Sequence, residues 1–169
     1  MRKKIQAKPI SYSSSKRDYR YIKYIVIHNT GNNGDTAENN GKFFANGNTR
    51  QAGAHYFVDQ EGNIVKSVDL NRAAWSVGGI KLKGDGGKCY GVVTNANSVS
   101  IELCDIVQKD PSAKMVKAVK QVIKEIRKHC PNAMFVCRHY DVTGKACPMR
   151  MVDEKKWKAF CKKIGETAL

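Results

Sequence analysis

Two apolar, β-branched stretches of this chain each end in a histidine, and this restricts the fold more than any other sequence feature. The first stretch covers residues 20–28 and ends in His28, before an Asn-Thr-Gly turn. The second covers residues 135–140 and carries His139 at its end. Stretches of this composition are typical of β-strands. Because a sheet delivers the residues at its strand ends to a loop-lined rim, we expect both histidines at such a rim.

A cysteine follows the second histidine after a short irregular segment. Residues 141–144 predict a turn, and Cys147 comes just before Pro148. An imidazole nitrogen and a thiolate form a donor pair that suits zinc, and His28 would complete a three-ligand set with a fourth position open for water. The spacing of His139 and Cys147 alone is also compatible with a buried cysteine beside an exposed turn histidine.

A structural zinc site is the rival interpretation of these donors. Cys137 shares a face with His139 if the strand alternates, and Cys130 is near in sequence. The rival site would consist of Cys130, Cys137, His139 and Cys147. It lacks the paired C-x-x-C spacing of structural zinc sites and leaves His28 unexplained, so we favour the set that contains His28.

Five stretches of the chain carry a resemblance to a known family. They read IVIHNTG (25–31), AHYFVDQEG (54–62), AAWSVGG (73–79), TNANSVSIELC (94–104) and RHYDVTGKACP (138–148). In this order they resemble the zinc N-acetylmuramoyl-L-alanine amidases of type 2, which include phage endolysins and share their fold with the peptidoglycan recognition proteins. The last stretch is the most specific. The resemblance implies zinc-dependent hydrolysis of the amide bond between N-acetylmuramic acid and L-alanine in peptidoglycan, for cell-wall lysis or remodelling.

The resemblance also implies roles for single residues. His28, His139 and Cys147 fall on the zinc ligands. Glu102, in the pattern IEL, falls on the catalytic glutamate, and Lys145 falls on a lysine that stabilises the oxyanion. In that scheme Glu102 takes a proton from the attacking water and returns it to the leaving amine.

Glu102 and Lys145 also have ordinary explanations. Residues 98–104 alternate as a strand, and Glu102 lies on the polar face, where a solvated carboxylate is common. Thirty residues are Lys or Arg, and most such side chains are simply solvated. Their positions distinguish these two residues from ordinary solvated side chains. Glu102 lies on a face that would open on the zinc rim, and Lys145 lies two residues before Cys147.

Two further residues, His55 and Trp75, are predicted to bind substrate. His55 lies on a predicted strand, residues 54–59, and the pattern does not decide which face it occupies. Trp75 lies in a Gly-bounded loop. Family members usually have Trp-His here and this chain has Trp75-Ser76, so any contact of that histidine is absent or replaced. Residues 78–97 predict a surface loop along the groove.

The remaining patterns predict one α/β domain with a mixed central β-sheet flanked by helices. We expect a short helix capped by Thr36 or Asp35, with Phe43 facing inward, and a β-hairpin over residues 54–68. A long amphipathic helix capped by Asp110 and a final helix over residues 153–164 complete the domain.

Length and composition set the remaining expectations. Residues 1–19 are polar and predict a loosely attached arm before a catalytic domain of residues 20–169. The start has no apolar segment of the signal-peptide kind, which predicts synthesis in the cytoplasm and action at the cell wall, on the host wall if the gene is phage-encoded. No run of eighteen apolar residues occurs, so we expect no membrane insertion. The six cysteines are expected to be mostly reduced and buried.

The net charge of +15 requires an anionic partner. Nucleic acid and the anionic polymers of a Gram-positive wall both fit the charge. No sequence pattern of a nucleic-acid module occurs, so we expect peptidoglycan, and no nucleic acid, as the partner. We also expect a monomer. Two alternatives of the same fold remain open: a non-catalytic peptidoglycan-binding module, against which Cys147 argues, and a regulatory partner that binds another protein.

Overall fold

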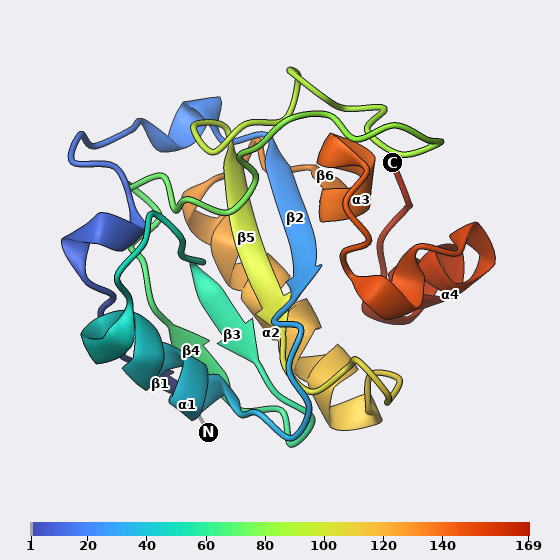
Figure 1. Cartoon of the computed structure of the whole chain (residues 1–169), viewed down its shortest axis with the longest axis horizontal. Coiled ribbons are helices and arrows are strands. Elements are labelled where there is room, and N and C mark those ends of the chain that lie inside the picture. The colour runs from blue at the N-terminus through green and yellow to red at the C-terminus, as the bar shows by residue number, and fades with distance from the viewer. Residues whose placement is uncertain (1) are drawn as a thin grey trace.

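A six-stranded mixed sheet organises the computed structural model, which describes residues 2–169 (Figure 1). The strands are β1 (Arg2–Lys4), β2 (Tyr24–Asn29), β3 (Tyr56–Val58), β4 (Ile64–Lys66), β5 (Ser98–Leu103) and β6 (Phe135–Arg138). Their spatial order is β1-β4-β3-β5-β2-β6, and neighbouring strands are parallel except the β3–β4 hairpin. The predicted α/β fold with a mixed central sheet is confirmed.

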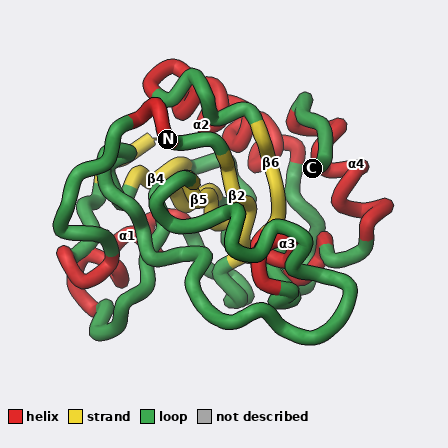
Figure 2. Tube along the Cα trace, turned by 90° about the horizontal axis from the view of Figure 1, so that it is seen from above, coloured by secondary structure: helices red, strands yellow, loops and turns green. Residues whose placement is uncertain are grey.

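Helices cover both faces of this sheet. They are α1 (Ala37–Lys42), α2 (Ala113–His129), α3 (His139–Thr143) and α4 (Glu154–Ile164). In Figure 1, α2 lies behind the sheet while α1 and α3 lie in front of it. Figure 2, viewed from above, shows the same layers, with long loops on the side of α1 and α3. The sheet therefore has one helix-covered face and one face covered mainly by loops and short helices.

The main hydrophobic core lies between the sheet and helices α2 and α4. Ile27 of β2 and Ile101 of β5 point to this side and pack with Met115 of α2 and Trp157 of α4. Because side chains alternate along a strand, the next residues, among them His28 and Glu102, point to the opposite side. The apolar stripes predicted for the long and the final helix are confirmed as the residues that fill this core.

Two local predictions were wrong. Ser112, not Asp110, caps α2, because its hydroxyl accepts from the Met115 N–H while the Asp110 carboxylate pairs with Arg150. Phe43 does not face inward: α1 ends at Lys42, a π-helical turn follows, and 46% of Phe43 is exposed. The predicted cap Thr36 is confirmed.

The N-terminal residues are attached to the domain, so the prediction of a loosely attached arm was wrong. Strand β1 pairs in parallel with β4, and the Ala7 N–H donates to Ser67 O at 2.9 Å. The Arg17 guanidinium donates to the carbonyls of Asn95 and Ser98, both at 2.7 Å. Partners this distant in sequence leave no local pattern, so the polar composition alone was misleading. The boundary of the catalytic domain at residue 20 stays a prediction.

The strand predicted over residues 135–140 ends earlier, at Arg138, and His139 starts helix α3. Asp141 causes this change of direction: its Oδ2 accepts from the Arg138 N–H at 2.7 Å, and its Oδ1 accepts from Arg138 Nη2 at 2.6 Å. The left-handed backbone of Gly144 (φ 81°) then ends the helix. His139 thus sits on a short helix immediately after the sheet edge.

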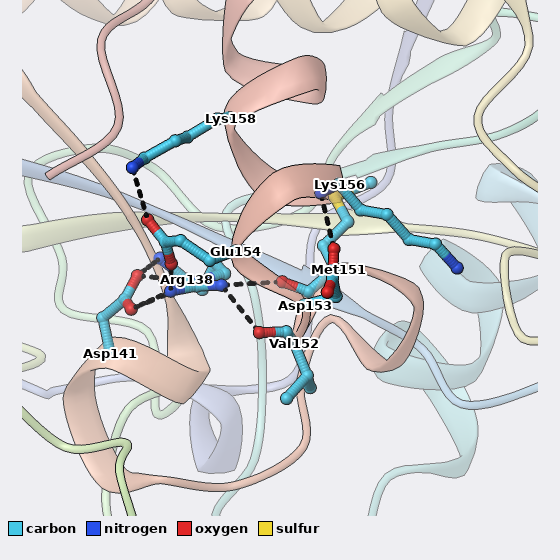
Figure 3. Close-up of polar contacts among 8 residues, drawn as sticks. All are labelled: Arg138, Asp141, Met151, Val152, Asp153, Glu154, Lys156 and Lys158. Carbon is cyan, nitrogen blue, oxygen red and sulfur yellow. Dashed lines mark hydrogen bonds and ion pairs between the residues drawn. The ribbon is translucent and has the colours of Figure 1, made fainter.

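Arg138 connects this turn to the last part of the chain, as Figure 3 shows. Its guanidinium donates to the carbonyls of Met151 and Val152 at 2.9 and 3.0 Å and pairs with Glu154 at 2.9 Å. Only 4% of its side chain is exposed, and the Asp141 partner is almost as buried. A charge this buried depends on its partners, because desolvation is compensated only by these contacts.

We expect Arg138→Ala to lower the free energy of unfolding by about 3–5 kcal/mol, because Asp141 would keep a buried charge without its partner. Denaturant unfolding followed by circular dichroism measures this. Lys158→Ala is the control, since Lys158 pairs with Glu154 in an exposed position and should change little. A parent-like free energy of unfolding in Arg138→Ala would show that this network does not stabilise the fold.

Candidate metal and catalytic site

The parallel register of β2 and β5 brings two predicted site residues together. His28 lies directly opposite Glu102 in the pairing of these strands. Both follow apolar, β-branched positions whose side chains fill the core on the other face. Both also lie near the carboxyl ends of their strands, the edge of an open parallel arrangement where ligands commonly bind.

His139 and Cys147 complete the cluster from the opposite neighbour of β2. The rings of His28 and His139 lie with centroids 4.7 Å apart, and Cys147 Sγ lies 3.8 Å from His28 Nδ1. The segment between α3 and Cys147 folds back because the Tyr140 N–H donates to Cys147 O at 2.7 Å. One ligand atom from each of His28, His139 and Cys147 lies within 4.8 Å of the others.

These residues fit a metal ion. His28 Nε2 and His139 Nε2 are buried and have no hydrogen-bond partner, which is costly in a protein interior unless another group occupies the site. Two imidazoles and one thiol are donors that zinc prefers. Within residues 2–169 no other cluster of three or more His, Cys, Asp or Glu side chains is close enough to share an ion. The rival site is therefore not assembled: Cys130 and Cys137 belong to different hydrophobic clusters.

Burial sets the protonation of the cluster. Desolvation lowers the pKa of His139 to about 4, with a contribution from Lys145, and holds the pKa of His28 well below its usual value. Both imidazoles are thus neutral at pH 7, as metal ligands must be. Burial raises the pKa of the Cys147 thiol to about 12, although the Asn29 N–H donates to its sulfur at 3.4 Å.

Glu102 is a partly exposed carboxyl with one buried, unpartnered oxygen, Oε2. Burial raises its pKa to about 7, while the Lys145 ammonium acts in the opposite direction and Asp35 adds to the rise. A carboxyl that titrates near neutral pH can both accept and return a proton. The polar face of β5 therefore opens on the cluster rather than on free solvent.

A cleft of ≈ 590 Å³, the central cleft, contains the cluster. Glu102, Lys145 and Trp75 line it together with the three candidate ligands. Trp75 and its neighbour Ser76 also border a second hollow of ≈ 540 Å³, whose other walls include part of the predicted loop 78–97. The structure thus brings six of the seven predicted site residues to one cleft.

His55 is the exception: it lies outside the central cleft, and its predicted contact with substrate stays a prediction. It is 1% exposed and does not line the central cleft. Its Nδ1 accepts from the Ser100 N–H at 3.1 Å, and its Nε2 lies 3.0 Å from Arg72 O and 2.9 Å from the Arg17 guanidinium. With both nitrogens engaged, His55 ties the N-terminal segment and two loops to β5.

Comparison with known proteins agrees with this geometry. A sequence model of the N-acetylmuramoyl-L-alanine amidase family matches residues 18–150. The N-acetylmuramoyl-L-alanine amidase XlyB of Bacillus subtilis (strain 168) is 32% identical over 139 residues, which is 79% of this chain and 39% of that protein. The chain belongs to this family.

Solved structures of similar proteins cover almost all of this amidase-family chain. The solution structure of the PlyG catalytic domain is 26% identical, with a TM-score of 0.74, and the match covers 98% of this chain and 93% of that one. A mutant endolysin from Bacillus subtilis is 26% identical, with a TM-score of 0.69 and coverage of 98% and 99%. The matched regions make up 38–53% of the length of the curated relatives. No helix within residues 2–169 is long and apolar enough to cross a membrane.

Parts of the cleft wall of this amidase-family chain come from distant segments and could not be predicted from the sequence. Asp35, Arg50 and the exposed Phe43 line the central cleft, and no local pattern marks them. The buried Ser11 holds two segments of the cleft region in place. The Trp75 N–H donates to its carbonyl at 3.0 Å, and Asn48 Nδ2 donates to its hydroxyl at 2.8 Å. Contacts between segments more than thirty residues apart became visible only in the fold.

Gly53 lies where this support leaves no room for a side chain. A Cβ at Gly53 would meet Ser11 O at 2.6 Å and Ser11 Cβ at 2.8 Å, and the Gly53 N–H donates to Trp75 O at 3.1 Å. We expect Gly53→Ala to cost about 1–3 kcal/mol of unfolding free energy, because backbone must shift. Denaturant unfolding measures the cost. The control is Gly78→Ala, whose Cβ would meet nothing closer than Asn95 Nδ2 at 3.9 Å; equal effects of both variants would contradict the assignment.

Proposed function

We propose that this chain hydrolyses the amide bond between N-acetylmuramic acid and L-alanine in bacterial peptidoglycan. The observation that carries the proposal is the convergence of His28, His139 and Cys147 beside Glu102 in one cleft of an amidase-family chain. The relative XlyB bears the name of this activity, and a similar solved structure bears the name endolysin. These names support a role in lysis of the cell wall, as a phage or prophage endolysin.

In this proposal His28, His139 and Cys147 hold a zinc ion. The donor set and the unpartnered Nε2 atoms of both histidines support the choice. When bound, zinc polarises the amide carbonyl and lowers the pKa of a coordinated water towards ~7. Both histidines are already neutral and can bind zinc without losing a proton, whereas the Cys147 thiol must lose its proton first.

Glu102 carries the proton in the proposed reaction. Its carboxylate accepts a proton from the attacking water as the new carbon–oxygen bond forms. It then delivers that proton to the alanine nitrogen as the carbon–nitrogen bond breaks. The products are a free amine and a lactyl carboxylic acid, which keeps the second proton of the water until it ionises in solution. The pKa of about 7 that burial gives this carboxyl supports both transfers.

Lys145 and Trp75 have binding roles in the proposal. The Lys145 side chain is exposed in the cleft and offers a cation to the oxygen that becomes negative during attack. Removing one such stabilising group commonly raises the barrier by ~2.7–4 kcal/mol. Trp75, held by Ser11 and Gly53, presents a fixed aromatic wall to the substrate.

The first test concerns the metal. We expect one zinc per chain, lost in His28→Ala, His139→Ala and Cys147→Ala. We also expect release of at least about one proton when zinc is added at pH 7.5, because the thiol is the one protonated ligand at that pH and a water on the metal can release a second proton. Elemental analysis and proton release into weak buffer give the two numbers. Cys130→Ala, altered in a core cysteine outside the cluster, is the control and should keep the metal. Zinc bound without proton release would exclude Cys147 as a thiolate ligand.

The second test concerns the reaction. We expect Glu102→Gln to keep the fold and the zinc but to lose about 10²–10⁴-fold in turnover, because an amide of nearly the same shape can neither take nor return a proton. Amine release from a defined soluble muropeptide, measured beside zinc content and a melting curve, separates these effects. Parent-like turnover in the zinc-loaded Glu102→Gln variant would remove Glu102 from the mechanism. A parent protein that loads zinc but releases no amine would favour a non-catalytic module.

A further inference from the structure

Helices α2 and α4 carry an unusual share of the positive charge. Together they hold eleven of the thirty Lys and Arg residues of the chain but two of its fifteen acidic residues. The two acidic residues are already engaged: Glu125 accepts from the Tyr56 hydroxyl and pairs with Arg2, and Glu154 pairs with Arg138 and Lys158. The excess positive charge of these helices is therefore not neutralised within them.

The lysines form a stripe on the outer surface of α2. Lys117, Lys120, Lys124 and Lys128 follow one another at three- and four-residue steps, all are exposed, and none forms an ion pair within residues 2–169. These steps correspond to about 4.5–6 Å along the helix. The stripe is thus a row of regularly spaced, unpaired cations.

Helix α4 extends this row. Lys155 and Lys162 are exposed and likewise form no ion pair in the described part of the chain. The two helices are packed together in one core cluster, and the Lys120 side chain approaches the end of α4, where its Cε lies 3.9 Å from an ideal Cβ on Gly165. We call these six unpaired lysines, Lys117, Lys120, Lys124 and Lys128 of α2 with Lys155 and Lys162 of α4, the lysine face.

The α2 part of the lysine face lies on the opposite side of the sheet from the central cleft. Alternation along β2 and β5 sends Ile27 and Ile101 towards α2, and His28 and Glu102 towards the cleft. Figure 1 shows α2 behind the sheet and α3, which starts at His139, in front. A long molecule bound to the lysine face would leave the cleft free.

Helix stability does not account for the lysine face. Cations favour the last turn of a helix, which explains Lys128 and Lys162. Lys117 and Lys120 lie far from that turn in α2, and Lys155 lies in the first turn of α4, where the helix dipole disfavours a cation. Like charges three and four residues apart also repel each other, so this arrangement weakens the isolated helix.

We propose that the lysine face binds a linear polyphosphate of the bacterial wall, such as a poly(polyol phosphate), while the cleft works on peptidoglycan. The choice of a wall polymer rests on the proposed function. Charge complementarity supports a polyanion, because its phosphates can neutralise the row in succession. Nucleic acid is the less favoured polyanion, because the one exposed aromatic side chain of α2 and α4 is His129, beside Tyr19 (ring centres 6.5 Å apart), so bases would find a stacking surface only at the end of the row.

The test compares two variants with the same loss of charge. In the first, Lys117, Lys120, Lys124 and Lys162 are replaced by Gln. In the control, four exposed lysines outside α2 and α4, namely Lys8, Lys16, Lys23 and Lys83, are replaced by Gln. Gln keeps the helix propensity of Lys, so both variants should fold. The probes are a poly(glycerol phosphate) of defined length and an oligo(dT) with the same number of phosphates.

We expect the parent protein to bind poly(glycerol phosphate) more tightly than oligo(dT), and binding to raise its melting temperature. The lysine-face variant should lose at least about 10-fold in affinity, and its slope of log K against log salt should fall by about 3, at ~0.7 for each lost phosphate contact. The control should lose less than about 3-fold. Turnover of a small soluble muropeptide should be unchanged in both.

Three results would overturn the proposal. Equal losses in both variants would show that the charge acts diffusely, tighter binding of oligo(dT) would indicate a nucleic-acid surface, and no binding by the parent protein would exclude the site. Binding is measured without cleavage. A parent protein that binds the polymer but releases no amine would therefore contradict the proposed function and leave the lysine face intact.

Discussion

Parallel pairing of β2 with both of its neighbours is the constraint on which the cleft depends. Since parallel strands end at the same edge, residues 28, 102 and 139 arrive together although more than a hundred positions separate the first from the last. The register fixes the details, because a shift by one residue would turn His28 into the apolar core and Ile27 into the cleft. The buried isoleucines and valines of these strands thus position the polar cluster as well as stabilising the sheet.

Arg138 adds the second constraint, at the point where the third strand ends. By binding Asp141 it turns the chain into α3 directly before His139, and by binding Glu154 and the carbonyls of Met151 and Val152 it connects this turn to the start of α4 (Figure 3). Its guanidinium also lies 5.4 Å from the Trp157 ring centre, within reach of a cation–π contact. One buried cation therefore couples the cleft side of the sheet to the main core.

Sequence patterns predicted the features that depend on residues close together in the chain. Alternation predicted β5 and its polar Glu102 face, β-branched composition predicted β2 and its terminal His28, and the pattern of residues 153–164 predicted α4. The failures share one cause. His55 was expected in the cleft, but Arg17, thirty-eight positions earlier, engages its ring. His139 was predicted in a strand because the sequence alone does not show that Arg138 is buried and pairs with Asp141.

Residues 2–19 also make contacts that no local pattern reveals. Ser13 exchanges two hydrogen bonds with Ala73, and the Ser11 carbonyl accepts from the Trp75 N–H. The cleft wall therefore depends on residues that precede the stretch matched by the family model, residues 18–150. A chain that began at residue 20 would expose these backbone groups to water and leave the buried Asn48 without its Ser11 partner. Since unpartnered buried polar groups are costly, residues 2–19 contribute contacts on which the shape of the cleft depends.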